Sequence, residues 1–110
     1  MVKIKRFDVF LVNLDPTIGS EIKKTRPAVI ISPDSMNLSR LKTVIIAPMT
    51  STIKNNFPTR ILTEFKDKKG LIALDQLRSI DRTRIVKKLG VIEREAQNKV
   101  LDLLSIIFQK

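Results

Sequence analysis

The side chains that could carry out chemistry in this sequence are basic, acidic and hydroxylic, because the chain contains no histidine and no cysteine. Ser-His-Asp, Cys-His and two-histidine mechanisms are therefore excluded, as is zinc held by these ligands. A basic cluster of Lys23, Lys24 and Arg26 stands directly before Pro27, and the hydroxyls of Thr50 and Ser51 follow an apolar run. Guanidinium and hydroxyl groups donate hydrogen bonds to anionic oxygens, so they suit a phosphate.

The charge of the chain points to a polyanionic partner. It has 21 Lys and Arg residues against 11 Asp and Glu residues, a net charge of +10, and an isoelectric point near 10.3. For a chain of this size, such a balance favours nucleic acid or an acidic protein as the partner. The basic residues are spread along the chain, so folding must build the anion-binding surface.

The length and hydropathy of the chain predict one domain, residues 1–110, acting in the cytoplasm. With 43% hydrophobic residues, 110 residues can bury a core without disulfides. No apolar run approaches the roughly 20 residues of a membrane span. The first eight residues become polar too soon for a signal peptide.

Apolar and β-branched runs separated by short turns predict a mainly β fold that positions these side chains. We expect strands at residues 7–14, 28–32, 43–49, 59–64, 71–74, 76–80 and 84–89, of which 71–74 and 76–80 could be continuous. Pro48 should end regular pairing, and turns are expected at 33–35 and 66–70. Apolar spacing from Ile92 predicts one amphipathic helix at about 93–108. Short connections favour a strongly curved antiparallel β-barrel with this helix packed on it.

Four blocks of the sequence carry a family resemblance. In order, they are Asp15-Pro-Thr-Ile-Gly-Ser-Glu21, Arg26-Pro-Ala-Val-Ile-Ile-Ser-Pro33, Ala47-Pro-Met-Thr-Ser51 and Leu74-Asp-Gln-Leu-Arg-Ser-Ile-Asp81, with Asn56-Phe-Pro-Thr-Arg60 between the last two. Their order and spacing are similar to those of the MazF/PemK toxin endoribonucleases of type II toxin–antitoxin systems. The resemblance covers about residues 7–107.

The resemblance implies an SH3-like antiparallel β-barrel (CcdB/PemK-like) with a C-terminal helix, in agreement with the strand pattern. It implies a homodimer that binds single-stranded RNA, such as mRNA, in a groove at the dimer interface and cuts it at short motifs without a metal ion or cofactor. It also implies an acidic antitoxin that blocks the groove. Within the blocks, Arg26 and Thr50 occupy the catalytic positions, Ser51 is a weaker neighbouring candidate, and Glu21 occupies a position linked to RNA contact.

The chemistry implied is attack by the ribose 2′-OH on the adjacent phosphorus, which yields a 2′,3′-cyclic phosphate and a 5′-OH end. Arg26 suits the negative charge that grows on the phosphate oxygens and could also donate a proton to the leaving oxygen, and Thr50 could donate one more hydrogen bond. A guanidinium is a strained choice of general base because its pKa exceeds about 12. Glu21, Asp75 and solvent therefore remain open as acceptors of the 2′-OH proton.

Further residues are expected to contact the RNA. Phosphate contacts are expected from Lys23, Lys24, Lys54 and Arg78, and base-edge contacts from Glu21, Asn55, Asn56 and Gln76. Phe57 is the only aromatic residue in a polar loop and is the expected stacking residue. Asp75 is expected either to contact RNA or to order the loop that carries Arg78.

Three alternatives compete with this interpretation. CcdB-type gyrase poisons share the barrel but act through a C-terminal Trp-Gly-Ile ending, and this chain contains no Trp. A passive nucleic-acid-binding barrel would explain the charge, but it would not explain why Arg26 and Thr50 lie within their family blocks. Asp75 and Asp81 could hold a metal, although two carboxylates are a weak signal.

Overall fold

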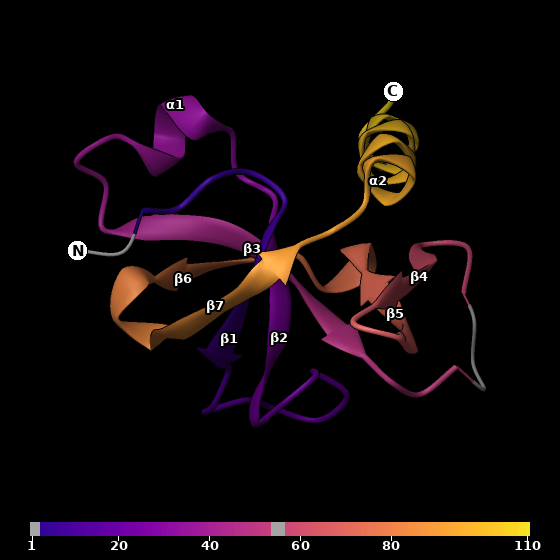
Figure 1. Cartoon of the computed structure of the whole chain (residues 1–110), viewed down its shortest axis with the longest axis horizontal. Helices are drawn as coiled ribbons and strands as arrows, with labels where there is room; N and C mark the ends of the chain where they lie inside the picture. Colours follow the sequence, from indigo (N-terminus) through magenta and orange to yellow (C-terminus); the bar gives the residue numbers. More distant parts are fainter. Residues whose placement is uncertain (1–2, 54–56) are drawn as a thin grey trace.

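In the part of the chain that the structure describes, seven antiparallel strands curl into a half-barrel with one long helix at its side (Figure 1). The computed structural model describes residues 3–53 and 57–110. The strands are β1 (Asp8–Asn13), β2 (Thr25–Ile30), β3 (Thr43–Thr50), β4 (Arg60–Phe65), β5 (Lys68–Ala73), β6 (Arg78–Asp81) and β7 (Ile85–Val91). The helices are α1 (Asp34–Asn37) and α2 (Arg94–Ile107), with 3-10 turns η1 (Leu74–Gln76) and η2 (Arg82–Arg84). The predicted mainly β fold with a C-terminal helix is confirmed.

Strand β3 is the centre of the sheet, whose order is β4-β5-β3-β2-β1-β7 with β6 also paired to β3. One edge of β3 pairs with β2 through residues 46–48, and the other edge pairs first with β6 through residues 43–46 and then with β5 through residues 49–50. The prediction that Pro48 ends regular pairing is wrong, because β3 continues to Thr50. Pro48 falls between the β6 and β5 ladders, where a missing N–H costs no ladder bond on that edge.

Three other local predictions need correction. Strand β2 begins at Thr25, so Pro27 is its third residue and lies just before the ladder to β3 begins at Ala28. Residues 34–37 form the short helix α1 rather than a simple turn. The turn expected at residues 66–70 is shorter, since β5 already starts at Lys68, and η1 separates β5 from β6.

Two hydrophobic clusters lie on the two faces of the curled sheet. Helix α2 covers one of them, and its fully buried Val100 and Ala96 pack with Ile61 of β4 and Ile72 of β5. The other cluster centres on Phe10 and neighbouring residues of β1, β2, β3 and β6. None of the helices in the described part of the chain has the length and apolar character needed to cross a membrane.

Candidate functional site

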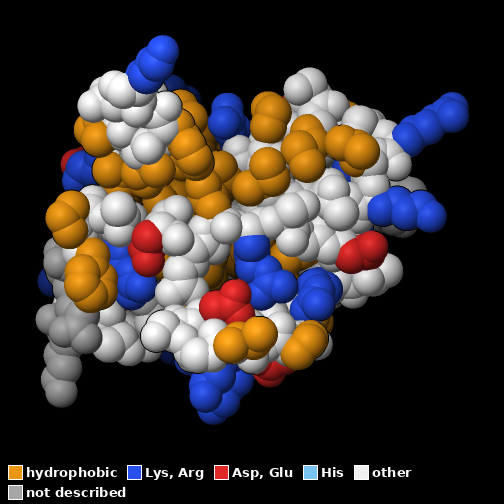
Figure 2. All heavy atoms as spheres, turned by 180° about the vertical axis from the view of Figure 1, so that it is seen from behind, with side chains coloured by type: hydrophobic (Ala, Val, Ile, Leu, Met, Phe, Trp, Pro, Cys, Tyr) orange, Lys and Arg blue, Asp and Glu red, His pale blue; other side chains and the backbone are white. Residues whose placement is uncertain are grey.

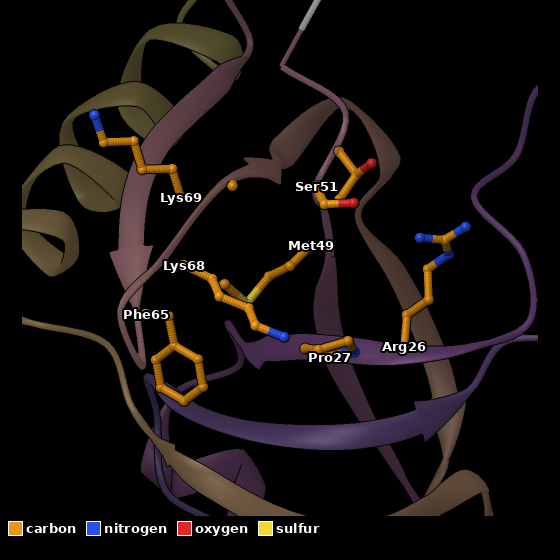
Figure 3. Close-up of a pocket in the computed structure, with 9 residues that line it drawn as sticks. Arg26, Pro27, Met49, Ser51, Phe65, Lys68 and Lys69 are labelled. Atoms are coloured by element: carbon orange, nitrogen blue, oxygen red, sulfur yellow. The ribbon is translucent and has the colours of Figure 1, made fainter.

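A pocket of about 180 Å³ lies over the last residues of β3, between β2 on one edge of that strand and β5 on the other (Figure 3). Strand β2 stops pairing with β3 at the Ala28–Pro48 pair, and β5 starts at the Met49–Ile72 pair. The pocket forms where these two ladders separate. Its lining residues are Arg26 and Pro27 of β2, residues 49–51 around the end of β3, Phe65 of β4 and residues 68–70 of β5.

Arg26 is oriented at the rim of this pocket by its own local backbone. Its Nε donates a 2.8 Å hydrogen bond to the carbonyl oxygen of Lys23, and the side chain is half-buried. Among the described residues, no carboxylate forms an ion pair with Arg26, and no hydrogen bond engages its two terminal nitrogens. Both terminal nitrogens can therefore donate to an anion in the pocket, as in bidentate phosphate binding.

Thr50 and Ser51 place two hydroxyl groups beside Arg26. Thr50 is the last residue of β3, and its Oγ1 accepts a hydrogen bond of 3.2 Å from the backbone N–H of Thr52. The hydroxyl proton of Thr50 remains available to donate to a ligand. In Figure 3, the Ser51 side chain lies on the same side of the pocket as the Arg26 guanidinium. The structure thus brings together the three residues implied as catalytic.

The β4–β5 hairpin supplies a wall of the pocket that the sequence did not predict. Phe65 and Lys68 form the last cross-strand pair of this hairpin, and Lys66 and Asp67 make the turn with φ values of 51° and 63°. The sequence predicts a turn at residues 66–70, but it does not indicate that the turn is confined to two residues and that Lys68 already belongs to β5. The Lys68 side chain enters the pocket, whereas that of Lys69 points away from it (Figure 3).

Two residues predicted to contact RNA, Gln76 and Arg78, hold the loop between β1 and β2. The Gln76 side chain accepts a 2.6 Å hydrogen bond from the N–H of Ile22 and donates one of 3.2 Å to the carbonyl of Ser20. Arg78 donates a 3.0 Å hydrogen bond to the carbonyl of Leu14 at the other end of the loop. These contacts span more than fifty residues of sequence, and no local pattern signals them.

Beside this loop lies a second, more polar pocket of about 500 Å³. It is lined by Ser20, Glu21, Ile22, Pro48, Asp75, Gln76, Leu77 and Arg78. Glu21 is exposed, and its Oε1 accepts a 2.6 Å hydrogen bond from the N–H of Ile18 in the same loop. Its second carboxylate oxygen can accept either a proton or a hydrogen bond from a nucleobase. The two pockets contact consecutive segments of β3, at Pro48 and at residues 49–51.

Asp75 forms a two-bonded ion pair with Arg60 of β4. Its Oδ1 accepts from Nε and its Oδ2 from Nη2, each at 3.1 Å. Partial burial acts to raise the pKa of Asp75, but hydrogen bonds from Arg60 and the local backbone, together with the Arg60 charge, outweigh it and leave the pKa below its usual value. Arg60 also lies over the Phe57 ring, 5.2 Å from its centroid. Asp75 lies in η1, in the segment that leads to Arg78, and its ion pair fastens this segment to β4.

Among the residues that the structure describes, the other predicted contact residues do not line either of these two pockets. Lys23 and Lys24 are exposed at the end of the β1–β2 loop. Phe57 is 51% exposed, although Arg60 covers one ring face. The predicted contacts at Lys54, Asn55 and Asn56 fall outside the described residues.

The charges at the first pocket favour an anionic ligand. Arg26 and Lys68 contribute cationic groups, and no carboxylate lines it. Across residues 3–53 and 57–110, no group of three or more Asp and Glu side chains is arranged to hold a metal ion. Asp81 accepts hydrogen bonds from the backbone N–H and hydroxyl of Thr83, which lower its pKa. The arrangement can bind a phosphate and stabilise added negative charge on it.

Known proteins share both sequence features and this fold. A family model described as PemK-like, MazF-like toxin of type II toxin–antitoxin system matches residues 5–108. The chain is similar to the solved MazF (form I) of Deinococcus radiodurans, with 22% identity, a TM-score of 0.85 and 100% of each chain covered. An endoribonuclease from Mycobacterial species, solved in complex with its cognate antitoxin, is 19% identical with a TM-score of 0.77 over 94% of this chain and 92% of that one. Mycobacterium tuberculosis toxin MazF-mt6 is 16% identical with a TM-score of 0.73 over 92% and 95%.

Proposed function

We propose that this chain, which belongs to the family of PemK-like, MazF-like toxins of type II toxin–antitoxin systems, is a sequence-specific endoribonuclease that cuts single-stranded RNA in the cytoplasm without a metal ion. The observation that carries the proposal is the pocket over the end of β3. There the Arg26 guanidinium, with two terminal nitrogens directed to no described partner, lies beside the hydroxyls of Thr50 and Ser51. Residues 1–110 would form one such toxin domain.

Arg26 and Thr50 would act on the scissile phosphate. As the 2′-oxygen attacks phosphorus, negative charge grows on the non-bridging oxygens, and a bidentate guanidinium is suited to stabilise it. The Thr50 hydroxyl would donate a further hydrogen bond, with Ser51 as its neighbour. Because these donors are already positioned, they need no reorganisation as the charge develops.

The acceptor of the 2′-OH proton is best assigned to Glu21 or to a water molecule that Glu21 orients. Both oxygens of Asp75 are engaged by Arg60, and its lowered pKa makes it a weaker base. Glu21 keeps one carboxylate oxygen outside its hydrogen bond to Ile18. Gln76 and Arg78 would then act by holding the loop that carries Glu21.

A homodimer is supported by an apolar surface beside α2. A depression of about 340 Å³ lies between β4 and α2, and Leu62 and Ile106 on it are 49% and 59% exposed. Hydrophobic side chains gather on the end of the molecule where α2 lies (Figure 2). Large exposed apolar patches typically mark protein interfaces. We therefore assign this face to the second copy of the chain.

The antitoxin partner would be an acidic segment, partly disordered when free, that folds on the basic surface around the pockets. The net charge of +10 supports this complementarity. Binding should weaken with added salt because the contacts are largely electrostatic. Binding that salt leaves unchanged would count against this assignment.

The proposal is tested by incubating the purified protein with a long single-stranded RNA in EDTA and mapping the cut sites. We expect cuts at one recurring short motif with 5′-OH ends, and none from Arg26→Ala at the same concentration. RNA binding by Arg26→Ala should persist. Intact RNA with the wild-type protein would instead favour a toxin that acts on a protein target, and a gyrase assay would follow.

A further inference from the structure

The cleavage proposed above leaves one proton unassigned. When the P–O5′ bond breaks, the departing 5′-oxygen needs a proton, because an alkoxide is a strongly basic leaving group. A guanidinium is a poor donor, since its pKa exceeds about 12. The hydroxyls of Thr50 and Ser51 are poor donors as well. The lining of the same pocket contains a stronger acid, the ammonium group of Lys68.

Lys68 lies on the pocket face of β5. Side chains alternate between the two faces of a strand, so Lys68 shares its face with Gly70 and Ile72. Ile72 pairs across the ladder with Met49, which lines the pocket. In Figure 3, the Lys68 side chain runs past Met49 into the pocket, with its ammonium directed toward Pro27. Its cationic group therefore enters the pocket from the side opposite Arg26.

The hairpin that carries Lys68 is anchored on both sides. At its turn, Lys66 and Asp67 adopt the left-handed conformation, which sets the register of the Phe65–Lys68 pair. The Phe65 ring packs against the backbone of Gly90 in β7, where an added Cβ would lie 3.1 Å from the ring. Lys68 is thus held by the geometry of its strand rather than by a flexible loop.

Lys69 provides a contrast at the adjacent position. It pairs across the hairpin with Glu64 on the opposite face of β5, and its side chain points away from the pocket (Figure 3). Both lysines are exposed and carry the same charge. The two lysines differ in the direction of their side chains. Comparing variants of Lys68 and Lys69 therefore distinguishes a role inside the pocket from a general effect of charge.

We propose that Lys68 is the general acid of the cleavage reaction. As the 2′-oxygen bonds to phosphorus and its proton passes to Glu21 or water, the P–O5′ bond breaks and its electron pair moves to O5′. The Lys68 ammonium transfers a proton to O5′, giving the 5′-OH end and a neutral amine that regains a proton from solvent. An ordinary lysine ammonium, with a pKa of about 10.4, is a stronger acid than a guanidinium and is protonated at neutral pH. The inference rests on the proposed ribonuclease function.

The test compares two RNA substrates that differ only in the leaving atom at a mapped cut site, which is oxygen in one and sulfur in the other. A thiolate leaves without a proton, because thiols have a pKa near 8.5. Lys68→Met should slow cleavage of the oxygen substrate by about 10²–10⁴-fold, as expected for loss of a general acid. The same variant should cut the sulfur substrate at close to the wild-type rate. Lys69→Met removes the same charge from the pocket lining and should affect the two substrates equally, because Lys69 would have no role in protonating the leaving atom.

Two results would overturn the role of Lys68. One is a Lys68→Met rate close to wild type on the oxygen substrate. The other is an equal loss on both substrates, which would indicate that Lys68 binds RNA or supports the fold. Thermal unfolding of each variant controls for folding. A wild-type protein that cuts neither substrate would overturn the ribonuclease proposal itself, a result distinct from either of these.

Discussion

A Cβ atom on Gly70 would lie 3.0 Å from the main-chain oxygen of Thr50. Strand β5 therefore approaches β3 closely where Thr50 reaches the pocket, next to the Thr50–Leu71 pair. Gly70→Ala should push the strands apart and displace the Thr50 hydroxyl relative to Arg26. Because misplacement by 1 Å can cost about 10²-fold in rate, we expect single-turnover cleavage to fall about tenfold or more with little change in RNA affinity. An unchanged rate would show that Thr50 tolerates the shift or takes no part.

The two neighbouring hydroxyls can be separated by mutation. Thr50→Ala should reduce single-turnover cleavage by about 10²–10³-fold, the usual cost of losing one preorganised donor to an oxyanion. Thr50→Ser keeps the hydroxyl and should retain most of the activity. Ser51→Ala should have the smaller effect of the two alanine variants. If Ser51→Ala were the more damaging, the donor role would pass to Ser51.

The Arg60–Asp75 pair predicts a pH-dependent contribution to stability. The pKa of Asp75 is lowered in the folded state, so the contribution is present above the unfolded-state value of about 4 and is lost as the pH falls through the lower, folded-state pKa. Asp75→Asn should reduce the free energy of unfolding at pH 7 by about 0.5–1 kcal/mol, since the pair is partly exposed. Urea unfolding measured at pH 7 and at successively lower pH checks this, and a deficit that does not shrink as the pH falls would contradict the ion-pair account.

The apolar face beside α2 predicts where the dimer forms. Ile106→Glu places a charge on the exposed depression between β4 and α2 and should convert the dimer into a monomer in light scattering. Phe108→Glu is the matched control, because Phe108 is 72% exposed and does not line that depression. A dimer that survives Ile106→Glu, or that dissociates equally in both variants, would place the interface elsewhere.

Much of the fold could be predicted because the sequence signals are local. The apolar runs of β1 and β3 and the apolar spacing of α2 identify their elements directly, within a residue or two of the observed bounds. Pro48 was misjudged because its effect depends on a long-range fact, the change of partner from β6 to β5 along one edge of β3. The local sequence does not indicate which strand pairs with each part of β3.

The candidate site, like the fold, contains residues that the sequence predicts and residues that only the structure identifies. Arg26, Thr50 and Ser51 were found through family blocks, and they line one pocket. Lys68 was missed because the turn predicted at residues 66–70 included it, whereas the observed turn is confined to Lys66 and Asp67 and Lys68 already belongs to β5. The partners of Gln76 and Asp75 lie 54 and 15 residues away along the chain, so their hydrogen bonds became visible only in the fold.

In the proposed cleavage, the nucleophile is the ribose 2′-OH, which attacks the scissile phosphate without a metal ion. The most direct measurement uses a single-stranded RNA with one deoxyribose on the 5′ side of a mapped cut site, incubated with the wild-type protein in EDTA. The account predicts that this bond stays intact, while an unmodified copy of the same motif in the same strand is cut to a 5′-OH end. Cleavage at the deoxyribose position would contradict the account, because the nucleophile would then be something other than the neighbouring 2′-OH.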